Sequence, residues 1–150
     1  HYLARSTDDK KRREAIVGEA AGLADEALAA SPDDPAAILW WAASQGEQAA
    51  IDRNMKALRS LKEIRSKLEA LRAKNPGYGG AAADRALAQL YRNAPGLISF
   101  GSSKKAREHF ESALQIAPDY PANLVYFADF LAASNDRERA RQLAQRALAS

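Results

Sequence analysis

Small and apolar residues recur at a fixed spacing before three prolines of the chain. Pro32, Pro76 and Pro118 each have such residues twelve, eight and five positions earlier. Residues four and three positions apart lie on one face of an α-helix, and small side chains there let a neighbouring helix approach closely. The pattern therefore predicts three helices that end before a proline and pack through one face. The residues of this face are Ala20, Ala24 and Ala27, then Ile64, Leu68 and Leu71, then Ala106, Phe110 and Ala113.

Prolines and capping residues mark where helices begin and end. The residue before a proline is disfavoured in the α region, so a helix tends to end there, whereas Pro35 and Pro121 suit the first turn of a helix. Asp33, Asp34 and Asp119 can accept the free amide hydrogens of those first turns. These signals predict seven helices, over residues 9–31, 35–45, 47–74, 80–93, 103–117, 121–134 and 136–149.

The pattern also repeats along the chain. Ala140 opens a fourth set of small residues 34 positions after Ala106, and two longer segments match at an offset of 86 positions. A 34-residue period resembles the tetratricopeptide repeat, in which antiparallel helix pairs stack. We therefore predict an all-α fold, a right-handed superhelix of about seven helices in a single domain over residues 1–150. The identities at the offset of 86 are Ala27 and Leu28 with Ala113 and Leu114, Pro32 and Asp33 with Pro118 and Asp119, Pro35 and Ala36 with Pro121 and Ala122, and Ala42 with Ala128.

Two segments depart from the repeat period. The helix predicted over 47–74 is about ten residues longer than the period requires, so we expect it to project beyond its neighbours or to pack against something extra. The segment 94–102 is an insertion that replaces the short turn expected between paired helices. Insertions in helical repeats lie in loops on one face, often the binding face, so we expect 94–102 to lie near a binding surface.

The composition excludes several classes of function. The 22 basic residues are nearly balanced by 19 acidic ones, so the net charge of +3 predicts no strong attraction to a nucleic acid. The absence of cysteine excludes disulfides and thiolate metal sites and leaves the cell compartment open. No apolar run reaches the roughly 20 residues that span a bilayer, so we expect no membrane-spanning segment.

Side chains suited to catalysis are few and scattered. His109 lies between Glu108 and Phe110 on a predicted helix, so we expect it at the surface or between helices, without a cluster around it. Asp33 and Asp34 lie at a helix start rather than in a cleft that would perturb the pKa of one of them. We therefore predict a protein that is not an enzyme and that holds no metal ion and no cofactor.

Aromatic residues outside the packing positions form a candidate binding groove. The repeat phase places Trp40, Tyr126 and Phe130 on another side of their helices, where Phe100 from the segment 94–102 can join them. The competing interpretation is that the long helix covers these rings. The candidate residues of the groove are Trp40, Tyr91, Phe100, Tyr126, Phe130 and Arg85.

Two charged residues near the start of the helix at 80–93 have two interpretations. Either Arg85 donates hydrogen bonds to an anionic ligand or partner, or Asp84 and Arg85 tie the helix start to the segment 94–102. Arg85 precedes a repeat position that faces the adjacent helix, so we expect it to be partly buried.

The C-terminal half resembles the tetratricopeptide-like T component of TRAP transporters (TatT-like) and, more distantly, the regulators of microtubule dynamics. The resemblance implies an all-helical superhelix without catalysis. It also implies a periplasmic, lipid-anchored accessory that associates with a solute-binding protein, whereas without it a cytoplasmic location stays open. The residues that carry the resemblance are Asn75 to Tyr78, Asp84 to Leu87, Tyr91, Pro95, Gly96, Gly101, Ser102, Lys105, Ala106, His109, Phe110, Ala117 to Pro121 and Asn123.

These observations predict a scaffold that binds a protein partner. A solute-binding protein of the periplasm is the partner that the resemblance implies, and self-association of the chain stays open. The alternative is a carrier of a small apolar ligand that uses a groove under the segment 94–102.

Overall fold

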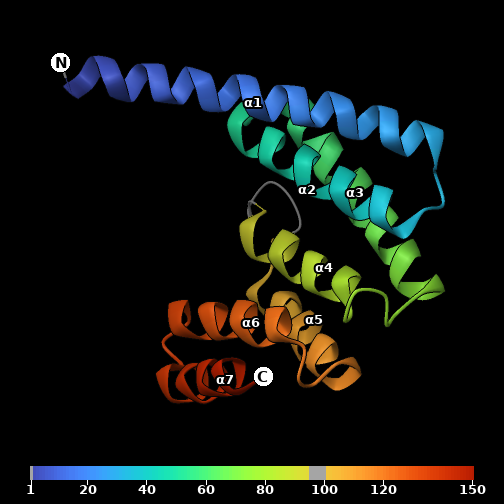
Figure 1. Ribbon diagram of the computed structural model, residues 1–150, viewed down its shortest axis with the longest axis vertical. Helices are drawn as coiled ribbons and strands as arrows, with labels where there is room; N and C mark the ends of the chain where they lie inside the picture. The colour runs from blue at the N-terminus through green and yellow to red at the C-terminus, as the bar shows by residue number, and fades with distance from the viewer. Residues whose placement is uncertain (1, 95–100) are drawn as a thin grey trace. The chain divides into compact units, whose positions relative to one another are not determined.

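The computed structural model describes residues 2–94 and 101–150, which form seven α-helices and contain no β-strand (Figure 1). The connections from α1 to α2, from α5 to α6 and from α6 to α7 are three or four residues long, as the repeat pattern predicts. The predicted all-α fold of tetratricopeptide-like helix pairs is therefore confirmed. The helices are α1 (Tyr2–Ala30), α2 (Pro35–Asp52), α3 (Met55–Lys74), α4 (Ala82–Asn93), α5 (Ser103–Ile116), α6 (Pro121–Ala133) and α7 (Arg137–Ala149).

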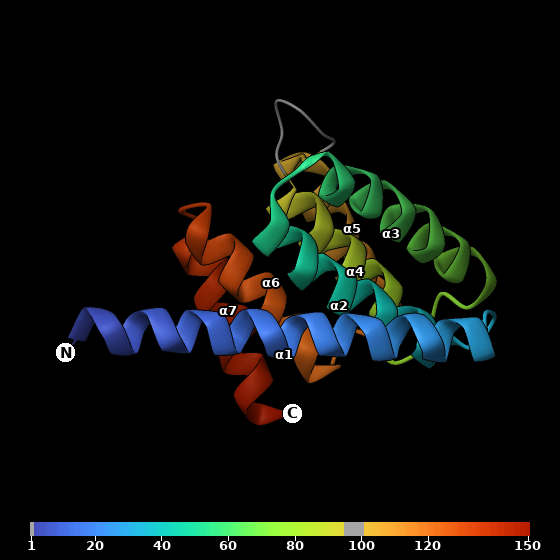
Figure 2. The same ribbon diagram turned by 90° about the horizontal axis from the view of Figure 1, so that it is seen from above.

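The chain divides into two compact units, His1–Lys67 and Leu68–Ser150, and the boundary falls within α3. In the first unit α2 lies alongside α1 in both views (Figures 1 and 2). In the second unit α4 packs against α5, α5 against α6, and α6 against α7. This succession of neighbours is the one expected of stacked helix pairs. The prediction of a single domain over residues 1–150 stays a prediction.

The core of the first unit forms where α1 meets α2. Ala24 and Leu28 of α1 are buried together with Trp41 and Ala42 of α2. The indole Nε1 of Trp41 donates a hydrogen bond of 2.8 Å to Oδ1 of Asp25, so the polar atom of this buried ring has a partner.

The core of the second unit is built from the predicted packing positions. Ala106, Phe110 and Ala113 of α5 are all buried, as their spacing predicts. The ring of Phe110 stacks on Phe127 of α6, with centroids 5.3 Å apart, and lies at the same distance from Phe130. Small side chains beside a large ring let α5 pack between α4 and α6.

The long helix predicted over 47–74 is wrong, because the chain breaks within it. Helix α2 continues through Gly46 to Asp52, and the chain then turns at Arg53, whose φ of 47° is left-handed. The side chain of Asn54 accepts a hydrogen bond of 2.9 Å from the amide of Ala57 and so caps the start of α3. A single glycine costs a helix only about 1 kcal/mol, which packing can offset, whereas the capping asparagine starts a new helix.

The longest helix is instead α1, with 29 residues, and it begins well before the predicted start at residue 9. Helix α3 has 20 residues and is still longer than α4 to α7, which have 12 to 14.

The turn from α3 to α4 depends on glycine. Gly79, Gly80 and Ala81 have consecutive positive φ angles of 54°, 63° and 62°. A Cβ atom on Gly80 would lie only 2.4 Å from a ring carbon of Tyr120. Helix α4 consequently begins at Ala82 rather than at the predicted residue 80.

Candidate functional site

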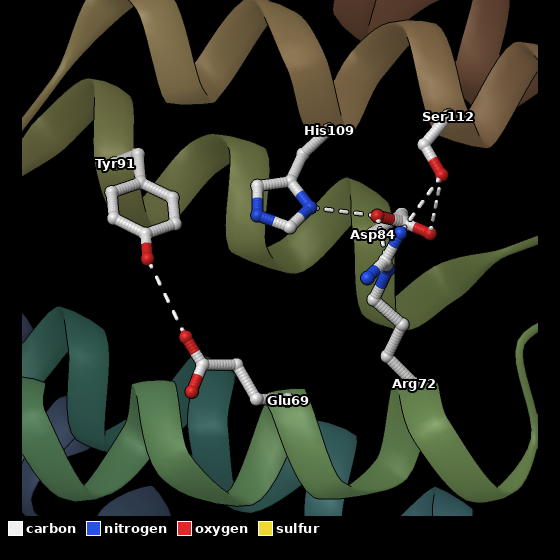
Figure 3. Close-up of polar contacts among 6 residues, drawn as sticks. All are labelled: Glu69, Arg72, Asp84, Tyr91, His109 and Ser112. Atoms are coloured by element: carbon white, nitrogen blue, oxygen red, sulfur yellow. Dashed lines mark hydrogen bonds and ion pairs between the residues drawn. The ribbon is translucent and has the colours of Figure 1, made fainter.

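A fully buried carboxylate, that of Asp84, lies in the first turn of α4 and joins three helices of the second unit (Figure 3). Nε of Arg72, in the last turn of α3, lies 2.8 Å from Oδ1 of Asp84. From α5, the hydroxyl of Ser112 donates a 3.0 Å hydrogen bond to Oδ2, and Nδ1 of His109 lies 2.7 Å from Oδ1. Asp84 therefore fixes α4 against α3 and α5 through both of its carboxylate oxygens.

The environment of Asp84 keeps the carboxylate ionised. Burial raises the pKa of Asp84, but the hydrogen bonds from His109, Arg72 and Ser112 and the positive charge of Arg72 outweigh it and lower the pKa below its normal value. An ionised carboxylate only accepts hydrogen bonds, so Nδ1 of His109 carries the proton in this pair.

A second set of contacts continues from His109 along α4. The imidazole stacks on the ring of Tyr91, with centroids 5.4 Å apart and planes 9° from parallel. The ammonium group of Lys105 lies 5.2 Å from the centre of the same ring, and the Tyr91 hydroxyl lies 3.5 Å from Oε1 of Glu69 (Figure 3). The prediction that His109 lies between helices is confirmed, and the prediction that it has no cluster around it is wrong.

The order of contacts in this cluster differs from that of a catalytic triad. The hydroxyl of Ser112 donates to Asp84, on the side of the carboxylate away from His109, so it is not activated by the imidazole (Figure 3). Among the described residues no group of three histidine or carboxylate side chains has the arrangement of a metal site. These contacts hold the last turn of α3, and the helices α4 and α5, at fixed positions relative to one another.

The cluster could not be found from local sequence patterns. Arg72, His109 and Ser112 are 12, 25 and 28 positions from Asp84. The one available signal is that Asp84 lies three positions before the buried Leu87, on the same face of its helix. A carboxylate on an apolar face indicates a buried ion pair, because a charge without partners is too costly to bury.

Arg85, the residue after Asp84, is held by a separate group of acceptors. One terminal nitrogen of its guanidinium donates to Oδ1 of Asn123 at 2.6 Å and to the carbonyl of Gly80 at 3.0 Å, and the other donates to the carbonyl of Gly79 at 3.2 Å. The guanidinium also lies over the ring of Tyr120, 5.2 Å from its centre. Arg85 is half-buried, as expected.

Both Asp84 and Arg85 tie the start of α4 in place, through described contacts with α3, α5, α6 and the turn at 79–80. A contact of either residue with the segment 94–102 stays a prediction. Residues 95–100 of that segment lie outside the described part of the chain. Burial lowers the pKa of Arg85, and the nearby hydroxyl groups of Tyr120 and Tyr126 act in the opposite direction.

A surface with aromatic and charged side chains lies where α4 and α6 expose residues in the second unit. Val125 and Tyr126 of α6 are exposed although this helix is mostly apolar. One turn further along α6, Asp129 accepts a 2.6 Å hydrogen bond from the guanidinium of Arg92 of α4. We call this surface, made of Arg85, Arg92, Val125, Tyr126 and Asp129, the α4–α6 face.

The residues of the predicted groove have different environments. Tyr126 is exposed on the α4–α6 face together with the half-buried Arg85. Tyr91 and Phe130 are buried, the first against His109 and the second against Phe110. Trp40 is exposed on α2 in the first unit, and Phe100 lies outside the described residues. A groove that unites all six residues stays a prediction.

Part of the chain matches a known protein family. Residues 97–150, which contain α5, α6 and α7, match the tetratricopeptide repeat family. No curated protein matches the chain. Among the helices described here, none is both long enough and apolar enough to cross a membrane.

Proposed function

We propose that this chain is a scaffold that binds a protein partner through the α4–α6 face. The observation that carries the proposal is that Val125 and Tyr126 are exposed on α6, while Arg85 and Arg92 of α4 bond to Asn123 and Asp129 of the same helix. Tetratricopeptide repeats are helical arrays that offer extended binding surfaces, and the match over residues 97–150 supports this use.

The chemistry of the α4–α6 face favours a peptide segment with an apolar residue and a carboxylate. Tyrosine and arginine are the residue types that most often dominate binding energy at protein interfaces. The guanidinium of Arg85 is already held by Asn123 and by the turn at 79–80, so little of its freedom remains to be lost on binding. We therefore expect Val125 and Tyr126 to contact the apolar residue of the peptide, and the guanidinium of Arg85 to bind its carboxylate.

We further propose that the partner is a solute-binding protein of the TRAP transporter type. The support is the resemblance of Asn75 to Tyr78 and of Asp84 to Leu87 to the T component of those transporters. Binding of this chain to a purified solute-binding protein encoded beside it would be measured by calorimetry, and absence of heat at high concentration would contradict this partner. The alternative, a carrier of a small apolar ligand, stays a prediction because Phe100 lies outside the described residues.

The scaffold proposal is tested with one variant of the face and a matched control. We expect Val125→Asp to reduce the amount of partner retained by the immobilised chain at least about tenfold, because it places a charge in the contact without a partner. Leu148→Asp makes the same kind of change at an exposed apolar residue of α7, outside the face, and should retain the partner fully. Equal retention by both variants, or no specific protein retained by the unmodified chain, would contradict the proposal.

A further inference from the structure

Helix α1 carries a line of apolar side chains on a face that α2 leaves open. Ile16 and Leu23 are 57% and 59% exposed, and Ala20, Ala27 and Ala30 are exposed as well. The adjacent side of the helix, with Ala24 and Leu28, is buried. Spacings of four, three, four and three residues align the exposed side chains in a stripe that suits a second helix. We call Ile16, Ala20, Leu23, Ala27 and Ala30 the α1 stripe.

The internal repeat shows what covers such a face elsewhere in the chain. At the offset of 86 positions Ala20 and Ala27 correspond to Ala106 and Ala113 of α5, which are both 0% exposed. The residue that corresponds to Leu23 is His109, which contacts Asp84 and Tyr91 of α4. The face of α5 that corresponds to the α1 stripe is thus occupied by α4.

The orientation of α4 on α5 follows from the same contacts. Asp84, at the start of α4, bonds Ser112, whereas Tyr91, near its end, lies under Lys105. The two helices are therefore antiparallel. In the first unit α1 packs against α2. Among the helix contacts of this unit, no helix covers the α1 stripe in the way that α4 covers the corresponding face of α5.

The charges beside the stripe indicate the chemistry of a helix that could bind there. Glu19 and Glu26 lie along one edge of the stripe and correspond to Lys105 and Ser112 of α5. Both are exposed, and neither has a hydrogen bond or ion pair with any described residue. A helix with lysine or arginine along its flank would pair with them. A copy of α4 itself does not fit, since its Asp84 would lie opposite Glu26.

We propose that the α1 stripe binds an amphipathic α-helix of a partner protein, antiparallel to α1, with leucine-type residues on its face and basic residues on its flank. Large apolar side chains of the partner fit over Ala20 and Ala27, while Ile16 and Leu23 contact small residues of the partner. This site lies in the first unit and is independent of the proposed function of the α4–α6 face.

The test compares two synthetic helical peptides that share one leucine and alanine face. One carries lysines along its flank and the other carries glutamates, and fluorescence anisotropy measures their binding to the full chain. We expect the lysine peptide to bind at least about tenfold more tightly. The double variant Glu19→Lys with Glu26→Lys should reverse this preference, and Leu23→Glu should abolish binding of both peptides.

The control variant lies on the same helix but outside the stripe. Ala29 is exposed on another side of α1, so Ala29→Glu should bind both peptides as the unmodified chain does. A preference that the double variant leaves unchanged, or full binding by Leu23→Glu with unaltered circular dichroism, would overturn the proposal. Sedimentation showing a dimer that Leu23→Glu dissolves would overturn it in favour of a second copy as the occupant. Val125→Asp should leave peptide binding unchanged, which separates this site from the α4–α6 face.

Discussion

Asp84 illustrates how a single buried charge can organise neighbouring helices. Its carboxylate is fully buried and accepts from three side chains that belong to α3 and α5. Removing one member of such a group leaves a buried donor or acceptor without its partner, which costs more than the net value of one hydrogen bond. The same residues hold His109 against Tyr91, so the packing of α4 on α5 depends on Asp84.

The role of Asp84 predicts a dependence of stability on pH. We expect Asp84→Asn to lower the free energy of unfolding by about 2 kcal/mol at pH 7. The pKa of Asp84 is lowered in the folded chain, so its contribution is present above the unfolded pKa of about 3.9 and is lost as the pH falls through the folded value. Urea unfolding of both proteins between pH 7 and 3 should show their difference shrinking below about pH 4. A difference that stays constant or grows in acid would contradict the argument.

Single residues decide where the helices of this protein begin and end. The spacing of alanines and prolines predicted the buried faces of α3 and α5, because residues at those spacings share one face of a helix. At the same positions of α1 only Ala24 is buried, whereas Ala20 and Ala27 are exposed. It did not predict the break at Arg53 and Asn54, because there a left-handed residue and one capping side chain outweigh the helical preference of their neighbours. Gly46, which separates the helices predicted over 35–45 and 47–74, lies within α2.

The turn between α3 and α4 provides a test at this scale. Gly80→Ala should destabilise the fold by about 1–3 kcal/mol from the positive φ alone, and by more if the ring of Tyr120 cannot move away from the new Cβ. Gly77→Ala is the matched control, since φ is not positive there and a Cβ would have nothing within 4 Å. Chemical denaturation curves of the two variants would be compared with the unmodified chain. Equal stability of the two variants would show that the turn tolerates a side chain.

At the scale of the whole molecule, the two compact units could unfold together or separately. The boundary at Lys67 and Leu68 lies within the continuous helix α3. Helices that cross a boundary can transmit unfolding, because fraying on one side removes hydrogen bonds from the other. We therefore retain the prediction of a single cooperative domain.

The two tryptophans make this prediction testable. Trp40 and Trp41 both lie in the first unit, so indole fluorescence reports on that unit alone. Asp84→Asn weakens the second unit, and in a single cooperative domain it should shift the fluorescence midpoint in urea as much as the midpoint from circular dichroism. A fluorescence midpoint that stays at the value of the unmodified chain would show two independent domains.

The sequence by itself determined the helical class, the repeat phase and the packing face of α5. These depend on spacing along the chain, and spacing fixes which side chains share a face of a helix. The tertiary structure alone decided the cluster at Asp84, the anchoring of Arg85 and the open stripe on α1. Each of these depends on which helices meet, and residues from distant segments become neighbours only when those helices pack.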